Sequence, residues 1–189
     1  AWKNSWRAPS RMSSRRGIPA LEQGWRGTAP DGYYSSMDDK KLTVERVIPA
    51  STAAIFNVLT NPKRHLELDG SGFIRADEHA ERIKAVGDVF TMDMEGEHMG
   101  GEYKTDNHVT GYSENALVAW KTAPAGTEPP GWEWIWELTS QGADETLVRL
   151  TYDWSKVTDK EILQKVTFPL ITEAQLEDSL VRLADAAAR

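Results

Sequence analysis

The residues whose types most suggest metal chemistry are four carboxylates and one imidazole around a glycine-rich turn. Carboxylate and imidazole groups both bind divalent cations. Their spacing matches no metal-binding loop, however, and strand alternation places Asp93 and Glu95 on the face opposite the apolar side chains. We therefore interpret the cluster as a solvated acidic hairpin and predict no metal site and no cofactor. Its members are Asp93, Glu95, Glu97, His98 and Glu102.

A second group of residues is aromatic or sulfur-containing and recurs at alternate positions of strand-like segments. Alternate residues of a strand share one face, so these side chains should point at a common interior. Trp and Tyr join an apolar ring to a polar atom and Met adapts its shape, so such a wall suits a flat or greasy ligand. The same residues could instead simply fill a core. The predicted ligand-binding residues are Phe90, Met92, Met94, Trp120, Trp134, Trp136, Tyr152 and Trp154.

Catalytic groups are not identifiable from spacing. The four His residues are scattered, HExxH and GxSxG are absent, and the chain contains no Cys. A buried His or carboxylate facing a pocket could act as general base in an aldol-type cyclisation. The nearest candidates, His65, Glu67, Asp69 and Asn107, have no partner at a recognisable spacing. We interpret them as surface or rim residues, and the catalytic residues of an enzyme stay unidentified.

Composition excludes several classes of protein. The 189 residues include 22 Lys and Arg, 29 Asp and Glu and no Cys, with a formal net charge of −7. The absence of Cys excludes a disulfide framework and a thiolate zinc site. The acidic balance disfavours a nucleic-acid partner, and no apolar run is long enough to span a membrane. We expect a cytoplasmic protein and leave a homodimer open.

The first 36 residues differ from the rest in charge and texture. They carry a net charge of +4, so the remainder carries −11. They are rich in Ser, Gly, Pro and Arg and show neither helical nor strand periodicity. This segment could be a leader that precedes the natural start at Met37, a basic arm or a transit-like targeting peptide. We therefore expect an N-terminal basic extension over 1–36 and one domain over 37–189.

From residue 37 onward the sequence predicts regular elements. Short segments in which apolar and polar residues alternate are separated by turn residues, which favours an antiparallel sheet. Ser51 and the pair Asn61-Pro62 are typical helix starts and predict two short helices between the first two strands. The predicted strands are residues 42–48, 78–85, 88–95, 102–110, 117–122, 132–139 and 145–154.

The periodicity becomes helical near the C-terminus. Thr158 and Thr172 each begin a pattern typical of a capping box, predicting a short helix and then a long amphipathic one. An antiparallel sheet must cover one of its faces, and the long helix is the available cover. We predict an α+β fold, a curved antiparallel sheet of about seven strands wrapped around the long C-terminal helix. The apolar stripe of that helix is Leu176, Leu180, Leu183, Ala184 and Ala187.

This order of elements and five stretches of sequence resemble the START-like (SRPBCC) superfamily, also called the helix-grip or birch-pollen-allergen-like fold. The polyketide cyclase/dehydrase branch is the most similar. The resemblance covers residues 37–189, about four-fifths of the chain. The stretches are VERVIPASTAAIFNVLTNP (44–62), GDVFTMDM (87–94), the segment 118–121 with Trp120, WEWIWELT (132–139) and TLVRLTYDWS (146–155).

The resemblance implies a deep, mostly apolar pocket between the sheet and the C-terminal helix. A hydrophobic small molecule of lipid, polyketide or aromatic type would sit there, and some members of the superfamily cyclise or dehydrate it. The superfamily shares no catalytic motif, and one fold can carry many functions. We therefore expect a ligand-binding protein, with a polyketide cyclase or aromatase and an interaction module with a filled core as alternatives.

Overall fold

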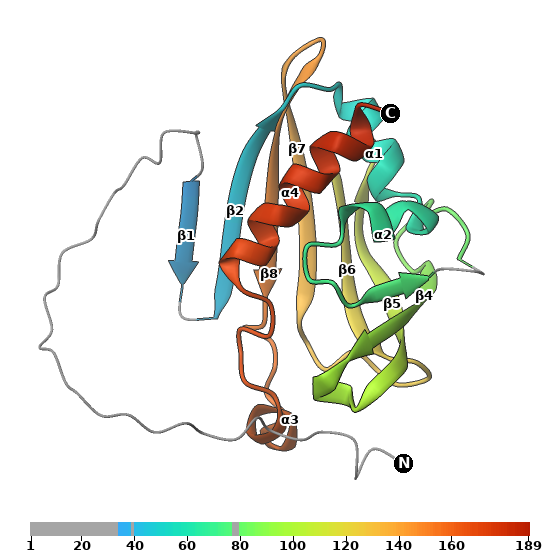
Figure 1. Cartoon of the computed structure of the whole chain (residues 1–189), viewed down its shortest axis with the longest axis vertical. Coiled ribbons are helices and arrows are strands. Elements are labelled where there is room, and N and C mark those ends of the chain that lie inside the picture. The colour runs from blue at the N-terminus through green and yellow to red at the C-terminus, as the bar shows by residue number, and fades with distance from the viewer. Residues whose placement is uncertain (1–33, 39, 77–79) are drawn as a thin grey trace, which may run out of the picture.

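Eight antiparallel strands form one curved sheet, which a long C-terminal helix crosses (Figure 1). The computed structural model describes residues 34–38, 40–76 and 80–189, and of 34–38, Ala76 and His98 it describes the backbone alone. The strand order is β1-β2-β8-β7-β6-β5-β4-β3. The strands are β1 (Tyr34–Asp38), β2 (Lys41–Ile48), β3 (Ile74–Ala76), β4 (Val89–Gly96), β5 (Gly101–Ser113), β6 (Leu117–Pro124), β7 (Glu133–Gly142) and β8 (Glu145–Asp153).

The predicted α+β helix-grip fold is confirmed, and so are six of the predicted strands, β2 and β4 to β8. The strand predicted over 78–85 is wrong, because residues 80–85 form no strand. The backbone N–H of Ile83 instead donates to the carbonyl of Thr60 at 2.9 Å, so this segment packs against the end of the first helix. The short strand β3 lies just before it.

Strand β1 pairs with β2 and contains Met37, where the sequence suggests a domain boundary. Met37 lies opposite Leu42 in this pairing. The rest of the predicted basic extension, including Trp2, Trp6 and Trp25, lies outside the described residues. The division at residue 37 therefore stays a prediction.

The helices begin where the sequence places capping residues. Ser51 accepts a hydrogen bond from the backbone of Ala54, and Thr172 and Gln175 form the predicted capping box. The shorter C-terminal helix is capped by Asp159, one residue after the predicted Thr158. The helices are α1 (Thr52–Leu59), η1 (Pro62–Arg64), α2 (His65–Leu68), η2 (Glu97–Met99), α3 (Lys160–Lys165) and α4 (Glu173–Ala187).

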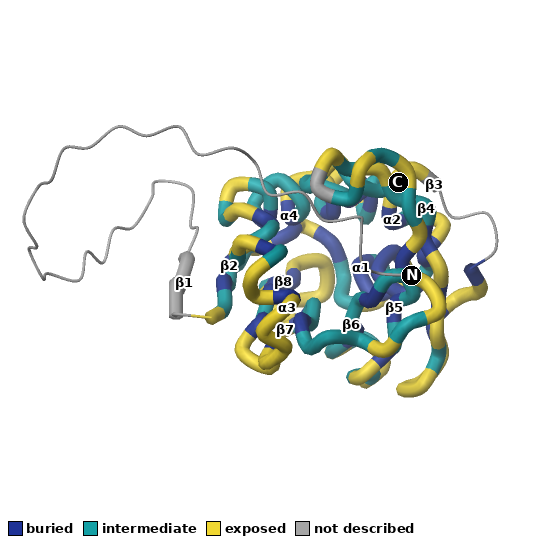
Figure 2. Tube along the Cα trace, turned by 90° about the horizontal axis from the view of Figure 1, so that it is seen from below, coloured by how far each residue is buried: buried dark blue, intermediate teal, exposed yellow. Residues whose placement is uncertain are grey.

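Helix α4 lies on the concave face of the sheet and buries its apolar stripe there. Leu176, Leu180 and Leu183 are at most 1% exposed, as the periodicity predicts. Ala186 is fully buried as well, whereas Ala184 is only partly buried. Seen from below, the strands follow an arc with α4 and α2 on its open side (Figure 2). The helix and the sheet thus enclose one interior.

A close backbone contact joins α4 to the loop after α2. The N–H of Gly70 donates to the Ser179 hydroxyl at 3.0 Å, and that hydroxyl donates to the carbonyl of Gln175 at 3.0 Å. A Cβ at position 70 would lie 2.2 Å from the same carbonyl oxygen. Only glycine allows this approach, which holds the N-terminal half of α4 beside the loop.

A charged clamp holds the other end of α4. The guanidinium of Arg64 donates to the carbonyl of Ala186 at 2.9 Å and pairs with Glu67, also at 2.9 Å. The hydrogen bond from Arg64 holds the pKa of Glu67 below its ordinary 4.5; burial opposes the shift, and the charges of Arg64 and Arg189 add to it. The clamp gives the Ala186 carbonyl a charged donor in addition to the backbone N–H of Arg189, which donates to it at 3.3 Å.

Replacing Gly70 by Ala should lower the free energy of unfolding by about 1–3 kcal/mol, because the new methyl group overlaps the α4 backbone. Denaturant unfolding measures the change. Gly142→Ala is the matched control, since a Cβ at Gly142 meets no atom within 4 Å. It should change stability by no more than about 0.5 kcal/mol. Equal effects of the two substitutions would contradict the contact.

Glu67→Gln should lower the free energy of unfolding by less than about 1 kcal/mol at neutral pH, because the ion pair between Glu67 and Arg64 is partly exposed. The folded-state pKa of Glu67 is lowered, so the stability from its charge is present above the unfolded pKa and lost as pH falls through the folded pKa. The difference in free energy of unfolding between Glu67→Gln and the wild type should therefore disappear at acidic pH.

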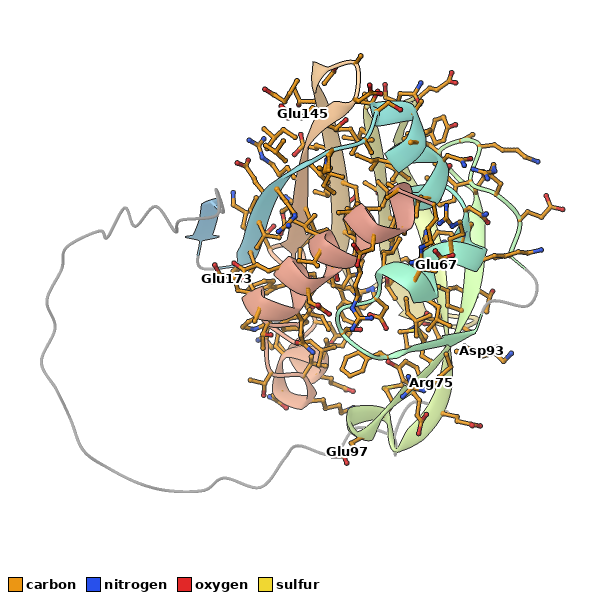
Figure 3. All side chains as sticks on the ribbon, turned by 45° about the horizontal axis from the view of Figure 1, so that its top comes forward. Glu67, Arg75, Asp93, Glu97, Glu145 and Glu173 are labelled. Atoms are coloured by element: carbon orange, nitrogen blue, oxygen red, sulfur yellow. The ribbon has the colours of Figure 1, made fainter. Side chains whose placement is uncertain are left out.

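Denaturant midpoints measured across the acidic range test this expectation. Glu145→Gln is the control, because Glu145 has no ion pair among the described residues. Figure 3 shows Glu67 on the α2 side of α4 and Glu145 at the far end of the β7–β8 hairpin. If the denaturant midpoints of Glu67→Gln and the wild type still differ below pH 3, the result would contradict a role for the Glu67 charge.

Candidate functional site

A cavity of about 150 Å³ lies between the concave face of the sheet and the elements that cover it. Strands β4 to β8 supply its walls. Leu68 of α2, the loop through Phe73, the segment before α4 and Leu176 of α4 supply its cover. The loop that Gly70 docks onto α4 is therefore part of the boundary of the cavity, and so is α4 itself.

Six of the eight residues predicted to bind a ligand line this cavity. They are Met92, Met94, Trp120, Trp134, Trp136 and Tyr152. Phe90 and Trp154 share the inward face but do not line it. The ring of Phe90 packs edge-on against Trp120 at 5.5 Å between centroids, and Trp154 stacks on Phe168 at 5.9 Å. These two residues belong to the core, and ligand binding by the other six stays a prediction.

The aromatic wall is a ladder of facing positions on three neighbouring strands. Trp120 lies opposite Trp134 in the β6–β7 pairing, and Trp134 lies opposite Tyr152 in the β7–β8 pairing. The rings of Trp134 and Tyr152 stack with centroids 4.5 Å apart and planes 17° apart. Cross-strand aromatic pairs of this kind stabilise a sheet.

Strand β5 adds a polar stripe, of which the sequence pattern pointed to Asn107 alone. Tyr103, Thr105 and Asn107 alternate along the strand and all line the cavity. Asn107 is 3% exposed and Thr105 is 6% exposed, so both are interior residues. The interpretation of Asn107 as a surface or rim residue is therefore wrong. Polar residues lie on both faces of β5, so the sequence of this strand alone does not reveal which face is buried.

His65 is also buried rather than exposed at a rim, since only 2% of its surface is accessible. Its ring stacks on Trp120 at 5.3 Å and meets Phe90 edge-on at 5.4 Å. Its Nε2 lies 2.7 Å from the carbonyl oxygen of Leu59. A carbonyl can only accept, so Nε2 carries a proton and donates it. This hydrogen bond fixes the orientation of the imidazole against the cavity.

The two tyrosines of the cavity are uncharged at neutral pH. Burial raises the pKa of Tyr103 to about 12, and the negative charge of Asp69 adds to the shift. Burial raises the pKa of Tyr152 still further, although a hydrogen bond from the Leu170 backbone opposes this. Both phenols therefore serve as neutral polar groups. Among the described residues, no Lys or Arg lines the cavity.

The acidic cluster lies away from the cavity, on the β4–β5 hairpin. Asp93 pairs with Lys104 and Glu95 with Arg75, each at 2.7 Å. Figure 3 shows Asp93 and Glu97 at the periphery of the sheet. Within the described ranges, no group of three or more His, Asp or Glu side chains is arranged to hold a metal ion. Within the same ranges, no helix is both long enough and apolar enough to cross a membrane.

Known proteins are similar to this chain in sequence. No protein-family model matches the chain. Over 179 residues it is 30% identical to Rv0088, an uncharacterized protein of Mycobacterium tuberculosis, in a match that covers 90% of this chain and 76% of that protein. The chain belongs to the family of Rv0088.

Solved structures share the fold of this chain. A protein from Arthrobacter aurescens matches with a TM-score of 0.61 at 10% identity, over 82% of this chain and 91% of that one. The Aha1 dimer from Colwellia psychrerythraea matches with a TM-score of 0.50 at 21% identity, over 77% and 94%. These likenesses concern the fold, and they agree with the helix-grip architecture of the sheet and α4.

Tyr152→Phe tests the hydrogen bond and the burial that hold the β8 side of the cavity wall. The variant should lose about 1 kcal/mol at pH 7, because the hydrogen bond between the phenol and the Leu170 backbone disappears. The folded-state pKa is raised, so the stability of the neutral phenol is complete below pH 10 and is lost as pH rises above it. Unfolding free energies between about pH 9 and 12 should therefore decline less steeply in the variant. Equal slopes would contradict the burial of this phenol.

Proposed function

We propose that this START-like protein binds a hydrophobic small molecule in the cavity between the sheet and α4. The observation that carries the proposal is a cavity of about 150 Å³ whose walls are mainly rings and Met side chains. Ligand sites are typically concave and apolar with a few well-placed polar groups, and Tyr103, Thr105 and Asn107 are such groups here. The cavity favours binding over an interaction module with a filled core.

The size of the cavity narrows the class of ligand. An engineered protein cavity of about 150 Å³ holds a benzene-sized molecule, whereas drug-sized sites span roughly 300–1,000 Å³. The stacked pair Trp134 and Tyr152 presents flat surfaces. Among the lipid, polyketide and aromatic types, a compact aromatic ligand, or one aromatic ring of a larger molecule, suits this space best.

An enzyme that acts in the same cavity, of the polyketide cyclase type, is the second candidate. A titratable group at the cavity favours it: His65 is buried there, and the half-buried Tyr103 lines the cavity as well. Tyr103 stays protonated at neutral pH and can donate a hydrogen bond to a carbonyl. If a ligand retained from expression is released and incubated with fresh protein, loss of one water from its mass would support catalysis. An unchanged mass would favour binding alone.

Met94→Trp tests the binding proposal by filling the cavity from β4. Native mass spectrometry of freshly purified protein should show a small organic molecule bound to the wild type and none bound to the variant. The fluorescence of the cavity Trp residues should respond when the extracted molecule is returned to the wild type. The physical reason is that the indole occupies the volume the ligand needs.

Val89→Trp is the matched control for this test. Val89 lies on the same strand but is 53% exposed and does not line the cavity, so the added ring points away from it. The control should retain the bound molecule. Retention by Met94→Trp, with native circular dichroism in both variants, would contradict the proposed site.

Two further expectations remain proposals. We propose a homodimer because the structure of the similarly folded Aha1 protein is that of a dimer. Light scattering at micromolar concentration distinguishes one chain of 21.2 kDa from two.

A cytoplasmic location likewise stays a prediction, which fractionation of the source cells would test.

A further inference from the structure

One wall of the cavity contains a small, continuous polar network. Thr105 and Asn107 of β5 and Thr122 of β6 all line the space. Asn107 and Thr122 face each other in the β5–β6 pairing, and Thr105 lies two positions along the same strand. Rings and Met side chains form most of the rest of the wall, where the indole N–H of Trp136 is also buried with no hydrogen-bond partner among the described residues. The interior is therefore mostly apolar, with this network on its β5–β6 side and with His65, Asp69, Ser71 and Ser179 on the covering side.

The hydrogen bonds within this network leave one proton unused. The Thr122 hydroxyl donates to Oδ1 of Asn107 at 2.7 Å. The Asn107 amide nitrogen donates to the carbonyl of Phe90 at 3.3 Å and to Oγ1 of Thr105 at 3.5 Å. Thr105 thus only accepts a hydrogen bond, and within the described part of the chain its own hydroxyl proton meets no acceptor.

An unused hydroxyl donor in a buried wall is unfavourable by itself. Burying a polar group without a partner costs free energy, which a hydrogen bond from a ligand can recover. Thr105 is 94% buried, and its neighbours Met92 and Asn107 are buried as well. Because Thr105 lines the cavity, the acceptor it lacks can come from a molecule that occupies the cavity.

The charges around the cavity decide what kind of acceptor fits. No Lys or Arg among the described residues lines the space, and Asp69 contributes a negative charge. The Asp69 carboxylate accepts hydrogen bonds from the backbone and hydroxyl of Ser71 and from the backbone of Ile74. A carboxylate or phosphate on the ligand would be desolvated beside this charge without a cation to pair with it. An uncharged oxygen, such as a ketone carbonyl, has no such penalty.

We propose that Thr105 is a specificity-determining residue and that the ligand is an uncharged aromatic carbonyl compound. Its carbonyl oxygen accepts the hydrogen bond from Oγ1 of Thr105, and its ring lies among the rings and Met side chains of the cavity. This inference rests on the proposed function, because it requires a small molecule in the cavity. It adds that the β5 side of the cavity recognises the ligand and that the recognised group is a carbonyl.

The test uses two probes of the same shape. Acetophenone carries a carbonyl group where α-methylstyrene carries a C=CH₂ group, so only the former can accept a hydrogen bond. Each is titrated into the ¹⁵N-labelled full chain, and dissociation constants are taken from the shifts of backbone amide signals. Thr105→Val removes the hydroxyl and keeps the branched shape, and Thr105→Ser keeps the hydroxyl. The same spectra report whether each variant is folded.

Thr105→Val should weaken acetophenone binding about three- to tenfold and leave α-methylstyrene binding unchanged or tighter. Thr105→Ser should retain most of the affinity for acetophenone. Equal effects of Thr105→Val on both probes, or no effect on either, would overturn the role of Thr105 while leaving cavity binding intact. If neither probe binds the wild type, the proposed aromatic-ligand function fails together with the inference.

Discussion

Burial of the apolar stripe of α4 against the concave face of the sheet is the contact on which the rest of the structure depends. Leu176, Leu180 and Leu183 are almost completely buried, and each such side chain stabilises the fold by roughly 1.5–3 kcal/mol. A curved antiparallel sheet cannot leave this face open to water. Backbone contact with Gly70 and the clamp from Arg64 then fix the two ends of the helix.

The cavity follows from how this helix and the sheet meet. Leu176 and Ser179, both in the first half of α4, belong to its cover. On the opposite side, Trp120, Trp134 and Tyr152 are large, flat side chains at facing positions on three strands. The space between these rings and the cover is the cavity of about 150 Å³.

Local patterns predicted elements well because capping and periodicity are short-range effects. Thr172 with Gln175 marks the start of α4, and alternation identifies the inward face of β4. The strand predicted over 78–85 fails because Ile83 satisfies its backbone on the end of α1. Strand β3, with three residues, is too short for a periodicity to show.

The sequence by itself determined the order of the elements, the covering helix and the face on which the aromatic residues lie, because alternation fixes sidedness. It could not determine which residues of that face line the cavity and which pack in the core beside it. Phe90 and Met92 share one face of β4, yet only Met92 reaches the cavity. Tertiary structure alone brought Thr105 and the ring of His65 to that cavity, because the residues that line it come from strands and helices distant along the chain, and His65 stacks on Trp120 of β6.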